Sequence, residues 1–451
     1  MISMQGKLFR KSLIFLLMLL VVSLLWSFSD VGSGHSSVAH AEDNGVANTP
    51  FMGWSTWSFI GKKPTEANVE AQARVLASKL KSHGFNYVLL DDFWYLDPRT
   101  TVDQYGRWVV DTSKFPHGLS GLASYVHSLG LKFGGYLTPG IPVAAVNQNT
   151  PIEGTKYHAK DIADTSQVEF NYNYGGGKKN TVMYYIDYSK PGAQEYINSW
   201  AKQLASWGVD FLKMDGVGSF DIPDVQAWSK ALNLSGRPIY FDLSNNLNIN
   251  NGSTWRQYAN AWRTQGDIEC YGHCTGQLVN WSKVNSRFSN AAQWAQFAGK
   301  GGWNDLDALD VADGTLDGVT NTERQTYMTL WAVACAPLYM GDDLTVMDSY
   351  GQQLLSNDEV IAVNQAGRVA TPLSQSSNQQ VWRVKNSDGT YTVALFNLGT
   401  AAATVTVNWS SLGLSGAKNV RDLWARKNLG SSTGSFSASL PSHGSRLLRV
   451  G

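Results

Sequence analysis

Short apolar runs alternate with helical stretches from Thr49 to about Leu355. Helical spacing of apolar positions predicts helices at Glu66–His83 and Ala193–Trp207, with Gly84 and Gly208 as their C-caps. Alternation of strands and helices predicts a parallel α/β fold, and eight strands make a (β/α)₈ TIM barrel. The predicted strands are Phe51–Trp57, Tyr87–Asp92, Lys132–Leu137, Phe211–Asp215, Ile239–Leu243, Ala261–Asp267, Gly302–Asp307 and Pro337–Gly341.

Beyond about Asn364 the apolar period changes to the two-residue alternation of strands. Val381–Lys385 and Tyr391–Asn397 flank an Asp-Gly turn and predict a β-hairpin. Short strands with Gly- and Ser-rich turns indicate a C-terminal antiparallel β-sandwich. We place the barrel at residues 48–358 and the sandwich at residues 364–451. The other assignments are strands at Ala403–Val407, Val420–Leu423 and Ser445–Val450, and a Ser/Gly-rich loop at Gly430–Ser439.

The N-terminus has the pattern of a targeting segment. Basic residues precede an apolar run at Leu13–Phe28, and Ala39-His40-Ala41 supplies a small-residue cleavage site. We therefore predict a secretory signal peptide at residues 1–41 and a secreted, extracellular protein. An uncleaved anchor is the alternative, since the run is close to spanning length.

Composition narrows the range of partners. The formal net charge is +0, which gives no electrostatic footprint for nucleic acid, and no membrane partner is expected after signal cleavage. We find no zinc-type Cys/His spacing and no phosphate-binding glycine loop, so no metal and no cofactor are predicted. The 17 Trp and 19 Tyr residues suit the faces of sugars, although most are expected to pack in the core or on the surface.

The chain has three cysteines. Cys270 and Cys274 are close enough to bridge in an oxidising compartment, and two free thiols are the alternative. Cys335 lies in an apolar run and is predicted to be buried.

Polar side chains gather where the predicted strands end. Lys213 precedes Asp215 by two residues, which places both on one strand face, and Arg263 precedes Asp267 by four. In a barrel this end carries the chemistry. A single aspartate there is often only a turn or helix cap, but several at matching positions favour a site. The residues are Trp57, Asp91, Asp92, Asp215, Asp267 and Asp307.

An ordered set of motifs resembles glycoside hydrolase family 27, which includes the α-galactosidases (melibiases). The resemblance implies a retaining, metal-independent double displacement, with Asp215 as nucleophile and Asp267 as acid/base. Such a mechanism needs one ionised and one protonated carboxyl group roughly 5–5.5 Å apart. The motifs are Met52-Gly-Trp-Ser-Thr-Trp, Leu90-Asp-Asp, Phe133-Gly-Gly-Tyr, Phe211-Leu-Lys-Met-Asp, Trp262-Arg-Thr-Gln-Gly-Asp-Ile, Gly302-Trp-Asn-Asp-Leu-Asp and Ala336-Pro-Leu.

The two roles make electrostatic demands on their neighbours. Lys213 is expected to keep Asp215 charged, whereas Asp267 needs a raised pKa. Arg263 opposes that, because a nearby cation lowers the pKa of an acid. We therefore expect Arg263 to bind a sugar hydroxyl or to orient a neighbouring group.

The resemblance also implies the sugar-binding residues. The aspartate pair is expected to bind the 4-OH and 6-OH, and structural roles for Trp57, Asp91 and Tyr136 are the alternative. Asp307 either contacts sugar, caps a helix or orients Arg263. The predicted set is Trp57, Asp91, Asp92, Tyr136, Lys213, Arg263, Ser244 and Asp307.

The chain departs from the galactosidase pattern around the expected sugar pocket. The usual Cys-Glu-Trp after the fifth strand is replaced by Phe241-Asp-Leu-Ser-Asn-Asn, which puts Ser244 in the place of an acid, and Ala308 replaces a methionine. The cysteines expected near the first two strands are absent. The long segment Ala144–Tyr188 is either a cover over the site or a decorative insertion.

The sequence thus predicts an exo-acting α-galactosidase that removes terminal α-linked galactose from oligo- or polysaccharides. A family relative with another specificity, such as an isomaltodextranase or a β-L-arabinopyranosidase, is the alternative. An inactive carbohydrate-binding protein is a remote one.

Overall fold

A computed structural model describes residues 44–169, 172–174, 180–272 and 274–451. The predicted signal peptide, residues 1–41, lies outside the described residues. Among the described helices, none combines the length and the apolar character that a bilayer span requires.

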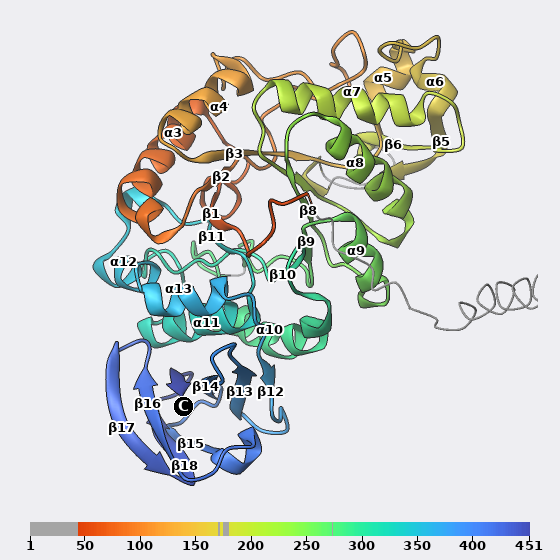
Figure 1. Ribbon diagram of the computed structural model, residues 1–451. Helices are drawn as coiled ribbons and strands as arrows, with labels where there is room; N and C mark the ends of the chain where they lie inside the picture. The colour runs from red at the N-terminus through yellow and green to blue at the C-terminus, as the bar shows by residue number, and fades with distance from the viewer. Residues whose placement is uncertain (1–43, 170–171, 175–179, 273) are drawn as a thin grey trace, which may run out of the picture. The chain divides into compact units, whose positions relative to one another are not determined.

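The predicted barrel strands are all present, and they pair in parallel with their neighbours in the sheet. Their order in the sheet is β10-β9-β8-β7-β3-β2-β1-β11 (Figure 1). A bond from Leu309 N to Tyr339 O (2.7 Å) links the segment after β10 to β11. The bounds are β1 Met52–Ser55, β2 Tyr87–Leu89, β3 Lys132–Leu137, β7 Phe211–Met214, β8 Tyr240–Leu243, β9 Ala261–Arg263, β10 Trp303–Asp305 and β11 Leu338–Met340.

Aromatic side chains cluster near the starts of several barrel strands. Phe211 stacks on Tyr240 with ring centroids 5.1 Å apart, and Phe51 packs against both of them and against Tyr339. Because side chains alternate along a strand, Lys213 projects to the same side as Phe211, but two residues nearer the carboxyl end. An apolar layer thus underlies the charged layer of the site.

Helices follow most of the barrel strands, as the alternating pattern predicted. The helix expected at Glu66–His83 is α3 continued by a π-helical turn (Leu76–Leu80) and a 3₁₀ turn (Lys81–His83). Gly84 (φ 98°) and Gly208 (φ 83°) have the left-handed backbone of C-caps, confirming that prediction. The helices are α2 Trp57–Ile60, α3 Glu66–Val75, α4 Gly118–Ser128, α7 Ala193–Ser206, α8 Ile222–Leu234, α9 Gly252–Tyr258, α10 Trp281–Trp294, α11 Asn321–Ala334, α12 Ser349–Leu355 and α13 Asp358–Gln365.

The long segment between β3 and β7 forms a subdomain of its own. Its three strands pair antiparallel in the order β4-β6-β5. Tyr188 OH donates to Asp224 Oδ1 (2.8 Å), and the carboxyl groups of Glu169 and Asp221 are hydrogen-bonded to each other. These contacts fasten the subdomain to the segment after β7. Its elements are β4 Ile141–Pro142, α5 Val143–Gln148, α6 Ala159–Ile162, β5 Ala163–Glu169 and β6 Met183–Ile186.

The C-terminal region is antiparallel, as predicted, with one sheet in the order β12-β13-β14-β19-β16-β17 and a second of β15 and β18. The loop expected at Gly430–Ser439 is wrong, since β17 and β18 occupy most of it. Ladder hydrogen bonds hold these Ser-rich strands, and most of their side chains are exposed, so hydrophobicity did not reveal them. The bounds are β12 Thr371–Pro372, β13 Gln379–Lys385, β14 Tyr391–Asn397, β15 Ala403–Asn408, β16 Ala417–Asp422, β17 Lys427–Thr433, β18 Ser435–Leu440 and β19 Ser445–Val450.

Helices α10 and α11 contact the sandwich. Gln325 Nε2 of α11 donates to Ser445 O (3.2 Å), and the His443 ring stacks on Trp281 with centroids 4.3 Å apart. Trp382 and Trp409 are buried, so two of the aromatic residues of the sandwich act as core.

Candidate active site

A cavity of about 370 Å³ opens at the carboxyl ends of β3 and β7. Asp215 and Asp267, the two predicted catalytic carboxylates, both line it. The two groups therefore share one space large enough for a sugar ring. The lining residues are Trp57, Lys62, Tyr136, Thr138, Asn173, Lys213, Asp215, Gly216, Asn245, Asp267 and Tyr271.

One wall of the cavity is carried by strand ends. Tyr136 on β3 pairs in register with Lys213 on β7, and the Tyr136 hydroxyl donates to Asp215 Oδ2 (3.2 Å). Lys213 Nζ forms an ion pair with Asp91 Oδ2 at 2.7 Å. Burial opposes the charge of Lys213, but the carboxylates of Asp91 and Asp215 outweigh it and raise the lysine pKa. The sheet therefore holds a permanent cation beside the predicted nucleophile.

Asp92 lies behind this wall with its carboxylate already bonded. Tyr95 OH donates to its Oδ1 (2.5 Å) and Asn173 Nδ2 to its Oδ2 (2.8 Å). Burial raises the pKa of Asp92 to about 6, although both bonds favour the charged form. Asn173 belongs to the segment between β3 and β7, so that segment reaches the predicted sugar-binding pair.

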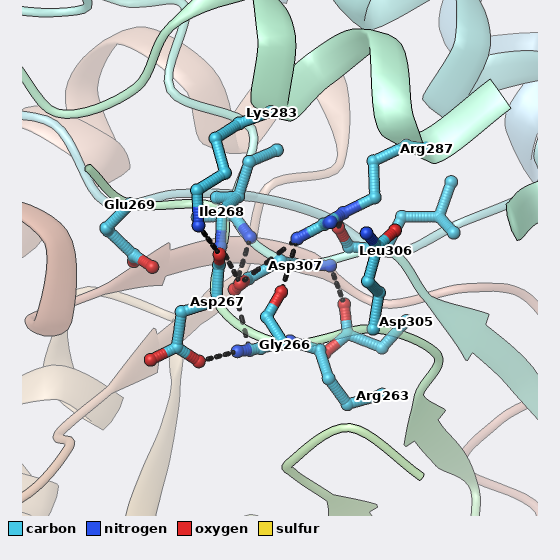
Figure 2. A network of polar contacts seen from close by, with 12 residues as sticks. Arg263, Gly266, Asp267, Ile268, Glu269, Lys283, Arg287, Asp305, Leu306 and Asp307 are labelled. Carbon is cyan, nitrogen blue, oxygen red and sulfur yellow. Dashed lines mark hydrogen bonds and ion pairs between the residues drawn. The ribbon is translucent and has the colours of Figure 1, made fainter. Parts of the chain in front are cut away.

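The opposite wall is organised by an arginine between two carboxylates. Arg263, at the end of β9, donates from Nη2 to Asp267 Oδ1 and from Nη1 to Asp307 Oδ1, each at 2.7 Å (Figure 2). Asp307 Oδ2 also accepts from Ile268 N (2.7 Å), and Lys283 Nζ donates to the backbone oxygen of Asp267 (2.8 Å). Asp307 therefore orients Arg263, one of the roles that the sequence left open.

The electrostatics of Asp267 contradict the raised pKa expected from the sequence. Burial works in that direction, but Arg263, the Tyr271 hydroxyl and Lys213 outweigh it and lower the pKa of Asp267 to about 2. The side chain is 41% exposed, so solvent also supports its charge. In the sugar-free structure this carboxyl group is ionised.

Three carboxyl groups in this wall are close enough together to hold a cation. Ligand oxygens of Asp267, Glu269 and Asp307 lie within 4.8 Å of one another. Arg263 already supplies a positive charge to two of them. Ser58 Oγ donates to Glu269 Oε1 (2.8 Å), and burial raises the pKa of Glu269, which favours its neutral form.

The predicted bridge between Cys270 and Cys274 is present, and it encloses a residue that sequence reasoning missed. Tyr271 OH donates to Asp267 Oδ2 (2.5 Å) and accepts from Trp57 Nε1 (2.6 Å). Its position inside a predicted disulfide loop just after Asp267 was a signal that could have drawn attention to it. Lys62, Thr138 and Asn173 were also missed, and they lie on segments with no distinctive pattern.

Five predicted site residues line the cavity, and five are buried behind it. Ser244 is 1% exposed, and its hydroxyl has no hydrogen-bond partner among the described residues. The cavity instead receives its neighbour Asn245, whose backbone has φ 153° and whose Nδ2 donates to Val217 O (3.2 Å). The lining set is Trp57, Tyr136, Lys213, Asp215 and Asp267, and the buried set is Asp91, Asp92, Arg263, Ser244 and Asp307.

A larger cavity of about 450 Å³ lies between α11, α12 and the sandwich. Trp424 lines it, but its Nε1 donates to Thr329 Oγ1 (2.9 Å), and Asp422 is paired with Arg446 (3.3 Å). Asp422 is the only carboxylate among the described residues that line it, so this cavity offers no comparable pair of carboxylates. Cys335, as predicted, is buried in the core.

Comparisons with known proteins agree with this geometry. Family models match at residues 67–231 (Melibiase), 173–366 (Alpha galactosidase A) and 376–450 (Alpha galactosidase C-terminal beta sandwich domain). The α-galactosidase of Cyamopsis tetragonoloba is 33% identical over 414 residues, which cover 90% of this chain and 87% of that protein.

Solved structures are similar along the same length of chain. A GH27 β-L-arabinopyranosidase from Geobacillus stearothermophilus matches with a TM-score of 0.81 and 33% identity, covering 90% of this chain and 97% of the other. α-Galactosidase I from Mortierella vinacea matches with a TM-score of 0.71 and 28% identity, covering 90% and 98%.

Proposed function

The chain belongs to glycoside hydrolase family 27, the melibiase family, and from this membership we propose that it is a secreted, retaining α-galactosidase acting on terminal sugars. The observation that supports the proposal most directly is that Asp215 and Asp267 line one cavity. Two carboxylates facing one glycosyl unit are the requirement of a double displacement.

In the proposed reaction Asp215 attacks the anomeric carbon and forms a covalent glycosyl-enzyme. Asp267 gives its proton to the departing oxygen, then takes one from the water that releases the sugar. The Lys213 cation and the Tyr136 hydroxyl support the charge on Asp215 before attack. The bond to the leaving oxygen breaks as Asp215 attacks, and the bond to Asp215 breaks as water attacks; each step inverts the anomeric carbon, so the overall configuration is retained.

The proton on Asp267 is the demanding part of this mechanism. Arg263 and Tyr271 both favour the ionised carboxylate in the sugar-free site. The exposed side chain of Asp267 lines the cavity, so a bound sugar would displace the solvent that supports its charge and would raise the pKa of this carboxyl group. Arg263, buried behind the cavity and bonded to both Asp267 and Asp307, holds the acid in place.

A β-L-arabinopyranosidase is the second candidate, and Asp92 is the observation that favours it. Tyr95 and Asn173 already occupy both of its carboxylate oxygens, which leaves less capacity for a 6-hydroxyl. L-Arabinopyranose resembles galactose without that hydroxymethyl group. The similarity to the Geobacillus enzyme is consistent with this alternative.

Hydrolysis of nitrophenyl α-D-galactopyranoside and nitrophenyl β-L-arabinopyranoside, with melibiose, raffinose and dextran, distinguishes these substrates. We expect the galactoside to give the highest kcat/KM, and NMR of the first product to show the anomer of the substrate. A higher kcat/KM for the arabinopyranoside would favour the second candidate. If none of these substrates were cleaved above the Asp215→Ala background, the assignment as a hydrolase would be contradicted.

A further inference from the structure

The segment between β9 and α10 carries a short covalent loop beside the site. The disulfide joins Cys270 to Cys274, and both cysteines are buried. Cys270 N donates to Leu278 O (2.8 Å), and Asn280 Nδ2 to Cys274 Sγ (3.1 Å). The base of the loop is therefore fixed to the segment that leads into α10.

Tyr271 lies inside this loop in an unusual backbone conformation. Its φ is 42°, a region that residues other than glycine rarely adopt, and the side chain is largely exposed toward the cavity. Such a conformation persists where the surrounding structure imposes it. The disulfide closes the loop that contains Tyr271, and two hydrogen bonds hold the hydroxyl of its side chain.

The Tyr271 hydroxyl bridges two functional groups by one hydrogen bond to each. The indole N–H of Trp57 only donates, and the ionised carboxylate of Asp267 only accepts. A hydroxyl between them accepts from the first at 2.6 Å and donates to the second at 2.5 Å. Trp57, a predicted sugar-binding residue, and Asp267, the proposed proton donor, are thus fixed relative to each other.

We propose that Tyr271, held by the Cys270–Cys274 loop, is a positioning residue that aligns Asp267 and Trp57 for substrates with a sugar leaving group. The inference rests on the proposed role of Asp267 as proton donor. A sugar alkoxide needs that proton when it departs, whereas nitrophenolate is stable without it. Alignment of Asp267 therefore matters most for oligosaccharides.

The charged and titratable groups around Asp267 determine how its pKa changes when the Tyr271 hydroxyl is removed. Arg263 pairs with Asp267, Lys213 lies across the cavity, and Glu269 and Asp307 face it from two loops. Without Tyr271 OH the ionised form loses one hydrogen bond while the other groups remain. The pKa of Asp267 then rises, and the basic limb of the pH profile moves to higher pH.

Tyr271→Phe is the direct test because it removes only the hydroxyl, and Tyr125→Phe on α4 is its matched control. For Tyr271→Phe we expect kcat/KM on melibiose or raffinose to fall about tenfold, chiefly in kcat, with a smaller loss on the nitrophenyl glycoside. The basic limb should move up by about half a pH unit. Unchanged leaving-group preference and an unchanged pH profile would overturn the proposal.

A double-mutant cycle tests the disulfide. Cys270→Ala/Cys274→Ala keeps the hydroxyl but frees the loop, so it should lower the same kcat/KM about fivefold. Tyr271→Phe should then cost less in that background than in the native chain, because the two changes disrupt one arrangement. Full additivity would contradict the coupling between loop and hydroxyl.

A readout that needs no turnover separates this inference from the proposed function. In protein carrying ¹³C-labelled aspartate carboxyl groups, with Asp267 assigned by Asp267→Asn, Tyr271→Phe should move the Asp267 titration midpoint upward. An inactive native chain with that shift would refute the hydrolase and its leaving-group role, while confirming that the Tyr271 hydroxyl stabilises the charge of Asp267. An active native chain without the shift would refute the positioning role alone.

Discussion

The two walls of the cavity are built by different means. On the first, Tyr136, Lys213 and Asp215 lie at the ends of adjacent strands, where the backbone ladder sets their positions. On the second, Asp267 and Tyr271 lie in a loop, where an arginine, a hydroxyl and a disulfide hold them. The strand wall depends on the sheet, whereas the loop wall depends on a few side-chain contacts.

The walls also differ in the charge state that they impose. Lys213 on the strand wall stabilises carboxylates whose proposed roles require ionisation. Arg263 on the loop wall does the same to Asp267, whose proposed role requires a proton. The loop wall must therefore rearrange its contacts during the reaction, and the strand wall need not.

The largest effect is expected from removing the proposed nucleophile on the strand wall. Asp215→Asn should lower kcat by at least about 1,000-fold, because no other carboxylate lining the cavity replaces it. Azide added to Asp215→Gly should restore turnover and give a glycosyl azide of inverted configuration. Asp187→Asn, at a surface turn, is the control and should retain full activity. Recovery of a retained product would contradict the assignment.

Breaking the ion pair of the strand wall should reduce stability as well as activity. Lys213→Met leaves the buried Asp91 without its cation and should reduce the free energy of unfolding by about 3–5 kcal/mol. Lys190→Met removes an exposed pair with Asp187 and should cost at most about 1 kcal/mol. Urea unfolding of both variants measures the difference. Equal losses of unfolding free energy would show that the buried pair contributes no more to stability than the exposed pair.

A conservative change tests the loop wall. Arg263→Lys keeps the charge, but a single ammonium group cannot reproduce the planar contacts with both Asp267 and Asp307. We expect kcat/KM to fall about 100-fold with a folded circular-dichroism spectrum. Lys62→Arg, also at the cavity, should lower kcat/KM far less. Near-native activity of Arg263→Lys would mean that catalysis does not require the planar guanidinium group of Arg263.

The smallest effect concerns the contact between the segment after β7 and the subdomain between β3 and β7. Burial and the hydrogen bond that the protonated Asp221 donates to Glu169 raise the pKa of Asp221 to about 10, so the folded protein holds a proton that the unfolded chain releases. Stability should therefore decrease as the pH rises from the ordinary range of an aspartate through that value.

Asp221→Asn removes this titration. Between about pH 7 and about pH 9 the melting temperature of the native chain should fall by roughly 3 °C more than that of the variant. Asp164→Asn, in β5, changes a carboxyl group whose pKa is lowered by hydrogen bonds from Ser166 and Gln167, and it should behave like the native chain. If the melting temperatures of the native chain and of Asp221→Asn changed in parallel with pH, Asp221 and Glu169 would share no proton.

Prediction from the sequence was accurate where periodicity carries the information. The eight barrel strands, the C-caps at Gly84 and Gly208, and the shared face of Lys213 and Asp215 follow from local patterns. Strand ends were less accurate: Trp57 lies in α2, after β1 rather than in it. The strands β17 and β18 were missed because an exposed strand needs hydrogen bonds and few apolar residues.

The sequence by itself determined the order of strands, the two catalytic candidates and the possibility of the disulfide, because each depends on residues close together in the chain. Only the tertiary structure decided that Asn245 rather than Ser244 reaches the cavity, that Tyr271 links Trp57 to Asp267, and that Arg263 holds Asp267 ionised. The pKa of a group and the reach of a side chain depend on how the folded backbone orients its neighbours. Arg263 and Tyr271 are near Asp267 in the chain and Lys213 is distant, but all three face it only in the folded barrel.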